Sequence, residues 1–145
     1  FVATFIGTPQ MNVAEAVLEG GPDGAYLRFG QGGSEARLPL PPEKAGLPVL
    51  APWFGKKVLF GIRPNDIHAD PDYLAQHPEQ HLEVSAEFVE RLGAESNIFC
   101  RAAGVEFSAV ADSKHLVENG AVVRLAFDGA AVHIFDPDTE NTVTN

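Results

Sequence analysis

The segment Gly61–His68, "GIRPNDIH", places arginine, asparagine, aspartate and histidine directly after the apolar run "VLF". These residue types could serve catalysis, hold a metal ion, or simply close a strand. Pro64 cannot continue a central β-ladder, and it favours an extended backbone at Arg63. Asn65 and Asp66 are turn-forming residues, and the isoleucine after them returns to the core. We therefore expect a strand end that displays Arg63 and Asp66 at a corner. The alternative to a binding role is a local Arg63–Asp66 pair that holds the turn, worth at most about 1 kcal/mol if exposed.

The histidines around this corner suggest a metal site, which their spacing does not support. His77 and His81 are four residues apart, but Pro78 lies between them and would interrupt a shared helix. No cysteine pair accompanies the histidines. The nearby acidic residues are Asp66, Asp70, Asp72, Glu79 and Glu83. We interpret the region as a solvated acidic loop and expect no metal ion.

No motif for catalysis or for a cofactor is complete. The pair Gly55-Lys56 comes nearest to a phosphate-binding P-loop, but Leu50 stands where the first glycine is needed and Lys57 where serine or threonine is needed. No G-x-S-x-G nucleophile motif occurs. Cys100 lies in a strand-like run and is interpreted as a small buried apolar residue. We therefore expect no enzymatic activity and no cofactor in this chain.

Composition limits the class of protein further. The chain has 145 residues, of which 45% are hydrophobic and 21% charged, as is typical of a folded domain. Its formal charge of −10 argues against nucleic acid and anionic lipid as partners. No apolar run approaches the roughly 20 residues needed to span a bilayer, and the first residues do not resemble a signal peptide. The single cysteine is compatible with the cytosol. The start at Phe1 rather than methionine predicts a piece of a longer protein.

Alternation of apolar and polar residues predicts the fold class. Period-2 patterning is typical of half-buried strands. It occurs in segments 13–17, 26–30, 57–62, 83–88, 97–102, 105–109, 122–127 and 131–135. Glycine-rich breaks separate many of these segments and supply turn residues. Many short strands at close spacing predict an all-β barrel or sandwich.

Four finer expectations follow from the same pattern. Within segment 83–88, Val84, Ala86 and Phe88 should share one face. Asp128-Gly129 lies between two alternating runs and predicts a β-hairpin. Asp70-Pro71 predicts the start of a short helix through Ala75. Asp112 predicts the cap of another short helix, through Val117.

Three stretches resemble the C-terminal regulatory region of ATPase subunits in carbohydrate-type ABC importers, the maltose and glycerol-phosphate transporter kind. "FVATFIGTPQMN" (1–12) resembles the segment that follows the nucleotide-binding domain in that family. "FGIRPNDI" (60–67) resembles its G-I-R-P-E-H motif, although Asn65-Asp66 replace Glu-His. The tail combines "VERLGAESNIFCR" (89–101) with "VVRLAFDGAAVHIFDPDT" (122–139), and resembles a strand pair and a closing h-x-F-D-x-x-T motif.

The resemblance implies OB-like barrels of the transport-associated type. The polar segment 69–81 divides the strand candidates into two groups, so we expect one regulatory unit, 1–145, with subregions 1–68 and 82–145 joined by that segment. Phe5 and Ile6 would pack the entry segment onto the β body. ATP and magnesium would belong to a preceding domain of the parent ATPase.

The implied function is that of a regulatory and dimerisation module. The implied partners are the nucleotide-binding domain of the same chain, a second copy of this region, the membrane subunits of a transporter and a cytosolic regulator. The implied location is the cytoplasmic face of the cell membrane. Arg63, Asp66, Gly93 and Glu95 are the candidate corners for an interface or an effector. The alternative is an OB-like sensor of an oxyanion or another small solute. A stand-alone β-barrel enzyme is a third hypothesis, for which the sequence supplies neither an acid–base pair nor a nucleophile.

Overall fold

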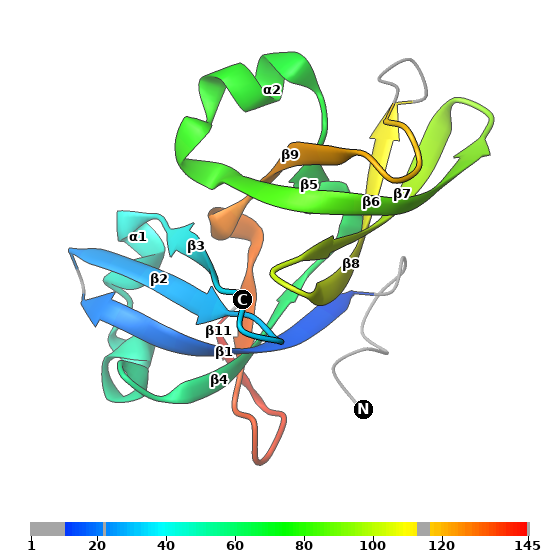
Figure 1. Cartoon of the computed structure of the whole chain (residues 1–145). Helices are drawn as coiled ribbons and strands as arrows, with labels where there is room; N and C mark the ends of the chain where they lie inside the picture. The colour runs from blue at the N-terminus through cyan, green and yellow to red at the C-terminus, as the bar shows by residue number, and fades with distance from the viewer. Residues whose placement is uncertain (1–10, 22, 113–116, 145) are drawn as a thin grey trace.

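The computed structural model describes residues 11–21, 23–112 and 117–144, and it is dominated by β-strands (Figure 1). The α-helices in this part of the chain are short: α1 spans Pro42–Ala45 and α2 spans Pro71–Gln76. Short 3₁₀ segments cover Pro48–Trp53, Pro64–Asp66, Pro78–Gln80 and Gly129–Ala131. The prediction of an all-β, OB-like fold with one or two short helices is confirmed. Among the described residues, no helix has the length and apolar character needed to cross a membrane.

The strands form two antiparallel sheets. In the described part of the chain, the first has the order β11-β10-β4-β1-β2-β3 and the second has the order β5-β9-β6-β7-β8. The strands of the first sheet are β1 (Asn12–Gly21), β2 (Gly24–Phe29), β3 (Ala36–Leu40), β4 (Lys57–Ile62), β10 (His133–Phe135) and β11 (Thr142–Thr144). The strands of the second sheet are β5 (Ile67–His68), β6 (His81–Leu92), β7 (Glu95–Ala102), β8 (Val105–Asp112) and β9 (Val122–Phe127).

The alternation in the sequence determines which face of each strand meets the core. In β1, Ala14, Ala16 and Leu18 are buried while Glu15 between them is exposed. In β2, Leu27 and Phe29 are buried in the same way. Burial of such apolar faces against one another is the main favourable contribution to folding.

Four phenylalanines join the two sheets in one core. Phe29 of β2 and Phe60 of β4 belong to the first sheet, and their ring centroids are 5.3 Å apart. Phe107 of β8 lies 5.7 Å from Phe29 and 5.3 Å from Phe127 of β9, with edge-on geometry in both pairs. The rings of the two sheets therefore interlock, and one hydrophobic cluster runs through both sheets.

Each half of the chain contributes strands to the sheet that the other half mainly forms. The short strand β5 follows β4 after the 3₁₀ turn Pro64–Asp66, but it pairs with β9 of the second sheet. The late strands β10 and β11 return to the first sheet, where β10 pairs with β4. The polar segment 69–81 contains α2 and leads into β6 (Figure 1). The division into subregions 1–68 and 82–145 stays a prediction.

The predicted hairpin at Asp128-Gly129 is wrong. The flanking strands β9 and β10 lie in different sheets, and the chain crosses between them through the 3₁₀ turn Gly129–Ala131. The side chain of Asp128 accepts a hydrogen bond from the N–H of Ala130 at 3.0 Å, so the turn-forming pair initiates a crossover instead of a hairpin.

The pairing of β6 with β7 corrects a second expectation. The register shifts between Ala86 and Phe88, as in a β-bulge. Val84 and Ala86 are buried as predicted, whereas Phe88 is turned to the outside.

The two helix predictions have different outcomes. α2 begins after Asp70, whose side chain accepts a hydrogen bond from the N–H of Asp72, so the predicted helix and its cap are confirmed. The helix predicted after Asp112 falls largely on residues 113–116, outside the described residues, as do Phe5 and Ile6.

Candidate functional site

The corner that the sequence singled out is the link between the two sheets. β4 ends at Ile62, Arg63 is extended (φ −77°, ψ 150°), and Pro64 opens a 3₁₀ turn. The N–H of Asp66 donates to the carbonyl of Arg63 at 2.9 Å and closes that turn. Ile67 is fully buried. The interpretation of "GIRPNDIH" as a strand end followed by a return to the core is confirmed.

The fold brings a distant residue, Asp128, to this corner. Strand β5 pairs with β9, with Ile67 opposite Phe127, and the N–H of Asp128 donates to the carbonyl of Asp66 at 3.1 Å. As a result, three side-chain ligand atoms lie within 4.8 Å of one another, one each from Asp66, His68 and Asp128. All three residues are half-buried. We call these three residues the corner cluster.

Opposing effects act on the titratable groups of the corner cluster. Burial raises the pKa of the Asp66 carboxyl, and the carboxylate of Asp128 raises it further, while His68, Arg63 and His133 act in the opposite direction. Burial lowers the pKa of His68, against the effect of both carboxylates. Two acidic groups and a histidine are thus held near one another.

The segment 69–81 covers one side of the corner with aromatic rings. The ring of Tyr73 in α2 stacks on His68 at a centroid distance of 3.8 Å, and His77 stacks on Tyr73 at 4.2 Å. The hydroxyl of Tyr73 donates to Oε1 of Gln80 at 2.8 Å, which fixes the ring in its own segment. The surface excursion expected from the sequence therefore orients His68.

A groove of about 580 Å³ lies next to the corner cluster. Its walls come from the end of β3 and the start of α1, from the α2 region, and from the 3₁₀ turn after β9. Asp128 belongs both to the groove and to the corner cluster. Tyr73, His77 and Glu79 also line the groove. The lining offers an imidazole and carboxylate groups, which can accept hydrogen bonds from the hydroxyl groups of a ligand.

Gly93 and Glu95 lie at a different corner, the tip of the β6–β7 hairpin. Leu92 pairs with Glu95 across the turn, and Gly93 has a φ of +67°, a backbone conformation that favours glycine. Glu95 is exposed. The hairpin projects from the body of the molecule, away from the β4–β5 turn that holds Arg63 and Asp66 (Figure 1). The four predicted site residues therefore occupy two separate corners.

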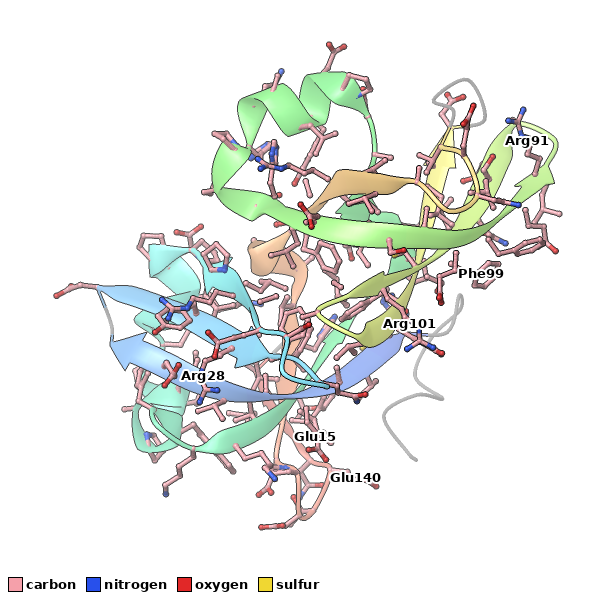
Figure 2. All side chains as sticks on the ribbon, viewed as in Figure 1. Glu15, Arg28, Arg91, Phe99, Arg101 and Glu140 are labelled. Carbon is pink, nitrogen blue, oxygen red and sulfur yellow. The ribbon has the colours of Figure 1, made fainter. Side chains whose placement is uncertain are left out.

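The outer face of the same hairpin carries large apolar side chains. The exposed fractions are 50% for Phe88, 56% for Leu92 and 41% for Phe99. Phe88 and Phe99 stack with their ring centroids 5.9 Å apart. Arg101 extends this face and pairs with Glu87 at 2.9 Å and Glu106 at 2.6 Å (Figure 2). We call Phe88, Leu92 and Phe99 the hairpin face. Exposed apolar groups gathered in this way make the hairpin face a candidate interaction surface.

Sequence reasoning missed two features of these sites. Asp128 appeared to be a hairpin residue, because nothing local to it indicates the pairing of β5 with β9. Phe88 appeared to face inward, because strict alternation cannot anticipate a bulge.

The two antiparallel sheets and the exchange of short strands between them define an OB-like β module. The chain belongs to the TOBE domain family: the family model described as TOBE domain matches residues 60–135. The family model described as MalK OB fold domain matches residues 7–67. The resemblance to importer ATPase subunits proposed from the sequence motifs is confirmed.

Curated relatives are similar along nearly the whole chain. The trehalose/maltose import ATP-binding protein MalK of Thermococcus litoralis is 33% identical over 99% of this chain and 37% of its own length. The oligosaccharides import ATP-binding protein MsmX of Bacillus subtilis is 31% identical over 97% of this chain and 36% of its own length. The sn-glycerol-3-phosphate import ATP-binding protein UgpC 1 of Rhizobium johnstonii is 28% identical over 100% of this chain and 35% of its own length. The chain thus spans about a third of the length of these relatives.

A solved structure shares the fold. The cytoplasmic molybdate-binding protein ModG with molybdate bound superimposes with a TM-score of 0.60, covering 87% of this chain and 96% of ModG, at 17% sequence identity. At that identity, the likeness concerns the fold alone.

Proposed function

We propose that this chain is the regulatory and dimerisation module of the ATPase subunit of a carbohydrate or sugar-phosphate ABC importer. The observation that carries the proposal is the similarity of 99% of this chain to a third of an import ATP-binding protein, over the OB and TOBE domains. In the proposed parent, ATP and magnesium bind in the nucleotide-binding domain, and this module hydrolyses nothing itself. The parent contacts the transporter's membrane subunits at the cytoplasmic face of the membrane.

The physical role of such a module is to hold two ATPase domains near each other. A tether converts the meeting of two domains into an intramolecular event, with an effective concentration set by its reach. Two copies joined through a rigid β body would keep their ATPase domains together while those domains open and close. The interlocked phenylalanines of the core supply that rigidity.

We assign the dimer contact to the hairpin face. Phe88, Leu92 and Phe99 are large, apolar and roughly half exposed, and they lie on one projecting hairpin. Contact with a second copy would remove these apolar groups from water, and each Å² of apolar area removed stabilises the dimer by about 25 cal/mol. The tip residues Gly93 and Glu95 border this face. The other corner, with Arg63 and Asp66, remains available to a cytosolic regulator.

Sedimentation velocity across a concentration series tests the proposal. The chain should show a reversible monomer–dimer equilibrium, and Phe99→Ser should shift it toward monomer. Val49→Ser is the matched control, because Val49 is 51% exposed but lies in the 3₁₀ segment Pro48–Trp53, outside the hairpin. A strict monomer at high concentration, or equal effects of the two substitutions, would contradict the assignment.

Calorimetry separates this function from the solute-sensor alternative. The chain should show no saturable heat with molybdate, glycerol phosphate or common sugars. Its formal charge of −10 disfavours free anions in general, although a local site can override the overall charge. Saturable molybdate binding would favour the oxyanion sensor instead.

A further inference from the structure

We propose that the corner cluster of Asp66, His68 and Asp128 is a binding site for a divalent transition-metal ion of the zinc class. From the sequence we expected no metal ion in this region, but the sequence does not reveal that Asp128, distant in the chain, joins Asp66 and His68. The inference rests on side-chain placement and is independent of the proposed role in import.

The geometry suits a small metal ion. The three ligand atoms lie within 4.8 Å of one another. Tetrahedral zinc with bonds of about 2.0–2.2 Å needs its ligand atoms roughly 3.4 Å apart. Binding of the ion therefore requires small side-chain rotations that bring the three ligand atoms closer together. The backbone itself is fixed by the β5–β9 pairing and by the hydrogen bond from Asp128 N–H to the Asp66 carbonyl.

The donor set selects the class of ion. One imidazole nitrogen and two carboxylate oxygens form a mixed nitrogen and oxygen set, which favours zinc and similar transition metals over magnesium or calcium. Two carboxylates also match the charge of a dication. Three protein ligands leave a fourth position for water or for an exogenous ligand, as in open zinc sites.

Neighbouring groups orient two of the proposed ligands. Oδ1 of Asp128 accepts a hydrogen bond from Ala130 N–H at 3.0 Å, which holds the carboxylate in place. The His68 ring is held by its stack on Tyr73. Supporting contacts of this kind pre-position metal ligands. The groove lined by Asp128 supplies an entry path for the ion.

The other histidines of segment 69–81 are placed differently. His77 lies on the far side of Tyr73 and pairs with Glu79 at 3.7 Å. Nε2 of His81 is 2.6 Å from the carbonyl oxygen of Leu74. His77 therefore provides a matched control, since it is a nearby stacked histidine outside the corner cluster.

Zinc titration by isothermal calorimetry tests the site. The chain, freed of any histidine tag and treated with EDTA, should bind one equivalent of Zn²⁺ from ZnCl₂. Substitutions His68→Gln and Asp128→Asn should each weaken binding at least tenfold, by the loss of a ligand. His77→Gln should bind zinc as the parent chain does. Mg²⁺ from MgCl₂ and Ca²⁺ from CaCl₂ should bind far more weakly than Zn²⁺.

Thermal unfolding provides a second readout. Zinc should raise the Tm of the parent chain and of His77→Gln, but not of His68→Gln, because only a folded site that binds the ion gains stability from it. If Asp128→Asn does not fold in EDTA, His68→Gln alone decides the test. Absence of saturable zinc binding, equal loss in His77→Gln and His68→Gln, or magnesium binding as tight as zinc would each overturn the proposal.

Discussion

The side chain of Asn12 in β1 is hydrogen-bonded to Ser108 in β8 and thereby ties the first sheet to the second. Its Oδ1 accepts from the N–H of Ser108 at 2.8 Å and from the hydroxyl of Ser108 at 3.3 Å. Its Nδ2 donates to the carbonyl of Ser108 at 2.9 Å and to the carbonyl of Ile62 in β4 at 3.0 Å. One amide side chain thus serves strands of both sheets at the end of β1.

Replacing Asn12 by alanine should destabilise the fold. Asn12→Ala leaves the N–H and carbonyl of Ser108 without these partners in a half-buried place, so the free energy of unfolding should fall by about 1–3 kcal/mol. Urea unfolding followed by circular dichroism measures the change. Asn97→Ala is the control, because the side chain of Asn97 makes a weak, exposed 3.5 Å contact with Glu90, and the substitution should change stability by less than about 0.5 kcal/mol. Equal losses of unfolding free energy in the two variants would show that the hydrogen bonds of Asn12 make no specific contribution to stability.

The interlocked rings predict a larger loss at Phe107. Phe107 contacts Phe29 in one sheet and Phe127 in the other, and it is only 3% exposed. Phe107→Ala should lower the free energy of unfolding by about 3–5 kcal/mol, because it removes apolar contacts and leaves a cavity. Phe99→Ala removes the same side chain from an exposed position and should cost far less. Chemical denaturation of both variants measures the difference, and similar losses would contradict the assignment of Phe107 to the core.

Most of the strands could be predicted from the sequence because their cause is local, although β3 (Ala36–Leu40) was not among the predicted segments. Alternation along β1, β2 and β7 reflects which face each residue turns to the core, and that pattern is visible within a few residues. The helix start at Asp70 was visible for the same reason, since an N-cap acts over two or three residues.

The corner cluster could not be predicted, because its cause is not local. Asp66 and Asp128 come together only because the chain passes from β4 of the first sheet into β5, which pairs with β9 of the second sheet. β5 has two residues, Ile67 and His68, too few to show alternation. Similarly, β11 is three residues long and its place beside β10 depends on long-range pairing. Local patterns therefore indicated the fold class and the Arg63 corner, while long-range contacts determined what surrounds that corner.

The crossover from β9 to β10 predicts that Gly129 does not tolerate a side chain. A Cβ atom at this position would lie 2.2 Å from the carbonyl oxygen of Pro39, so the backbone of one segment would have to move. Gly129→Ala should therefore lower the free energy of unfolding by about 1–3 kcal/mol, like other overpacked sites.

Gly21→Ala serves as the control for Gly129→Ala. A Cβ atom at Gly21 would meet nothing within 4 Å, so this variant should keep the stability of the parent chain to within about 0.5 kcal/mol. Thermal melts of the two variants provide the measurement. A Gly129→Ala variant as stable as Gly21→Ala would mean that β3 and the crossover do not pack as described.

The buried thiol of Cys100 predicts how stability depends on pH. Burial, aided by the negative charge of Glu87, raises the pKa of this thiol from 9.0 to about 12. In the unfolded chain the thiol ionises near its ordinary pKa, while in the folded chain it stays protonated. The unfolded state therefore binds fewer protons between pH 9 and 12, and stability is lost as the pH rises through that window.

Comparison with Cys100→Ala isolates this effect from the other groups that titrate at high pH. Between pH 8 and pH 10 the parent chain should lose about 1 kcal/mol more unfolding free energy than the variant, because one thiol ionises only when unfolded. The cavity left by the substitution changes the unfolding free energy by the same amount at both pH values, so its effect cancels in the difference. Urea unfolding of both proteins at the two pH values gives the four free energies required. Parallel losses in the two proteins would show that Cys100 ionises as readily in the folded chain, and hence that β7 does not bury it.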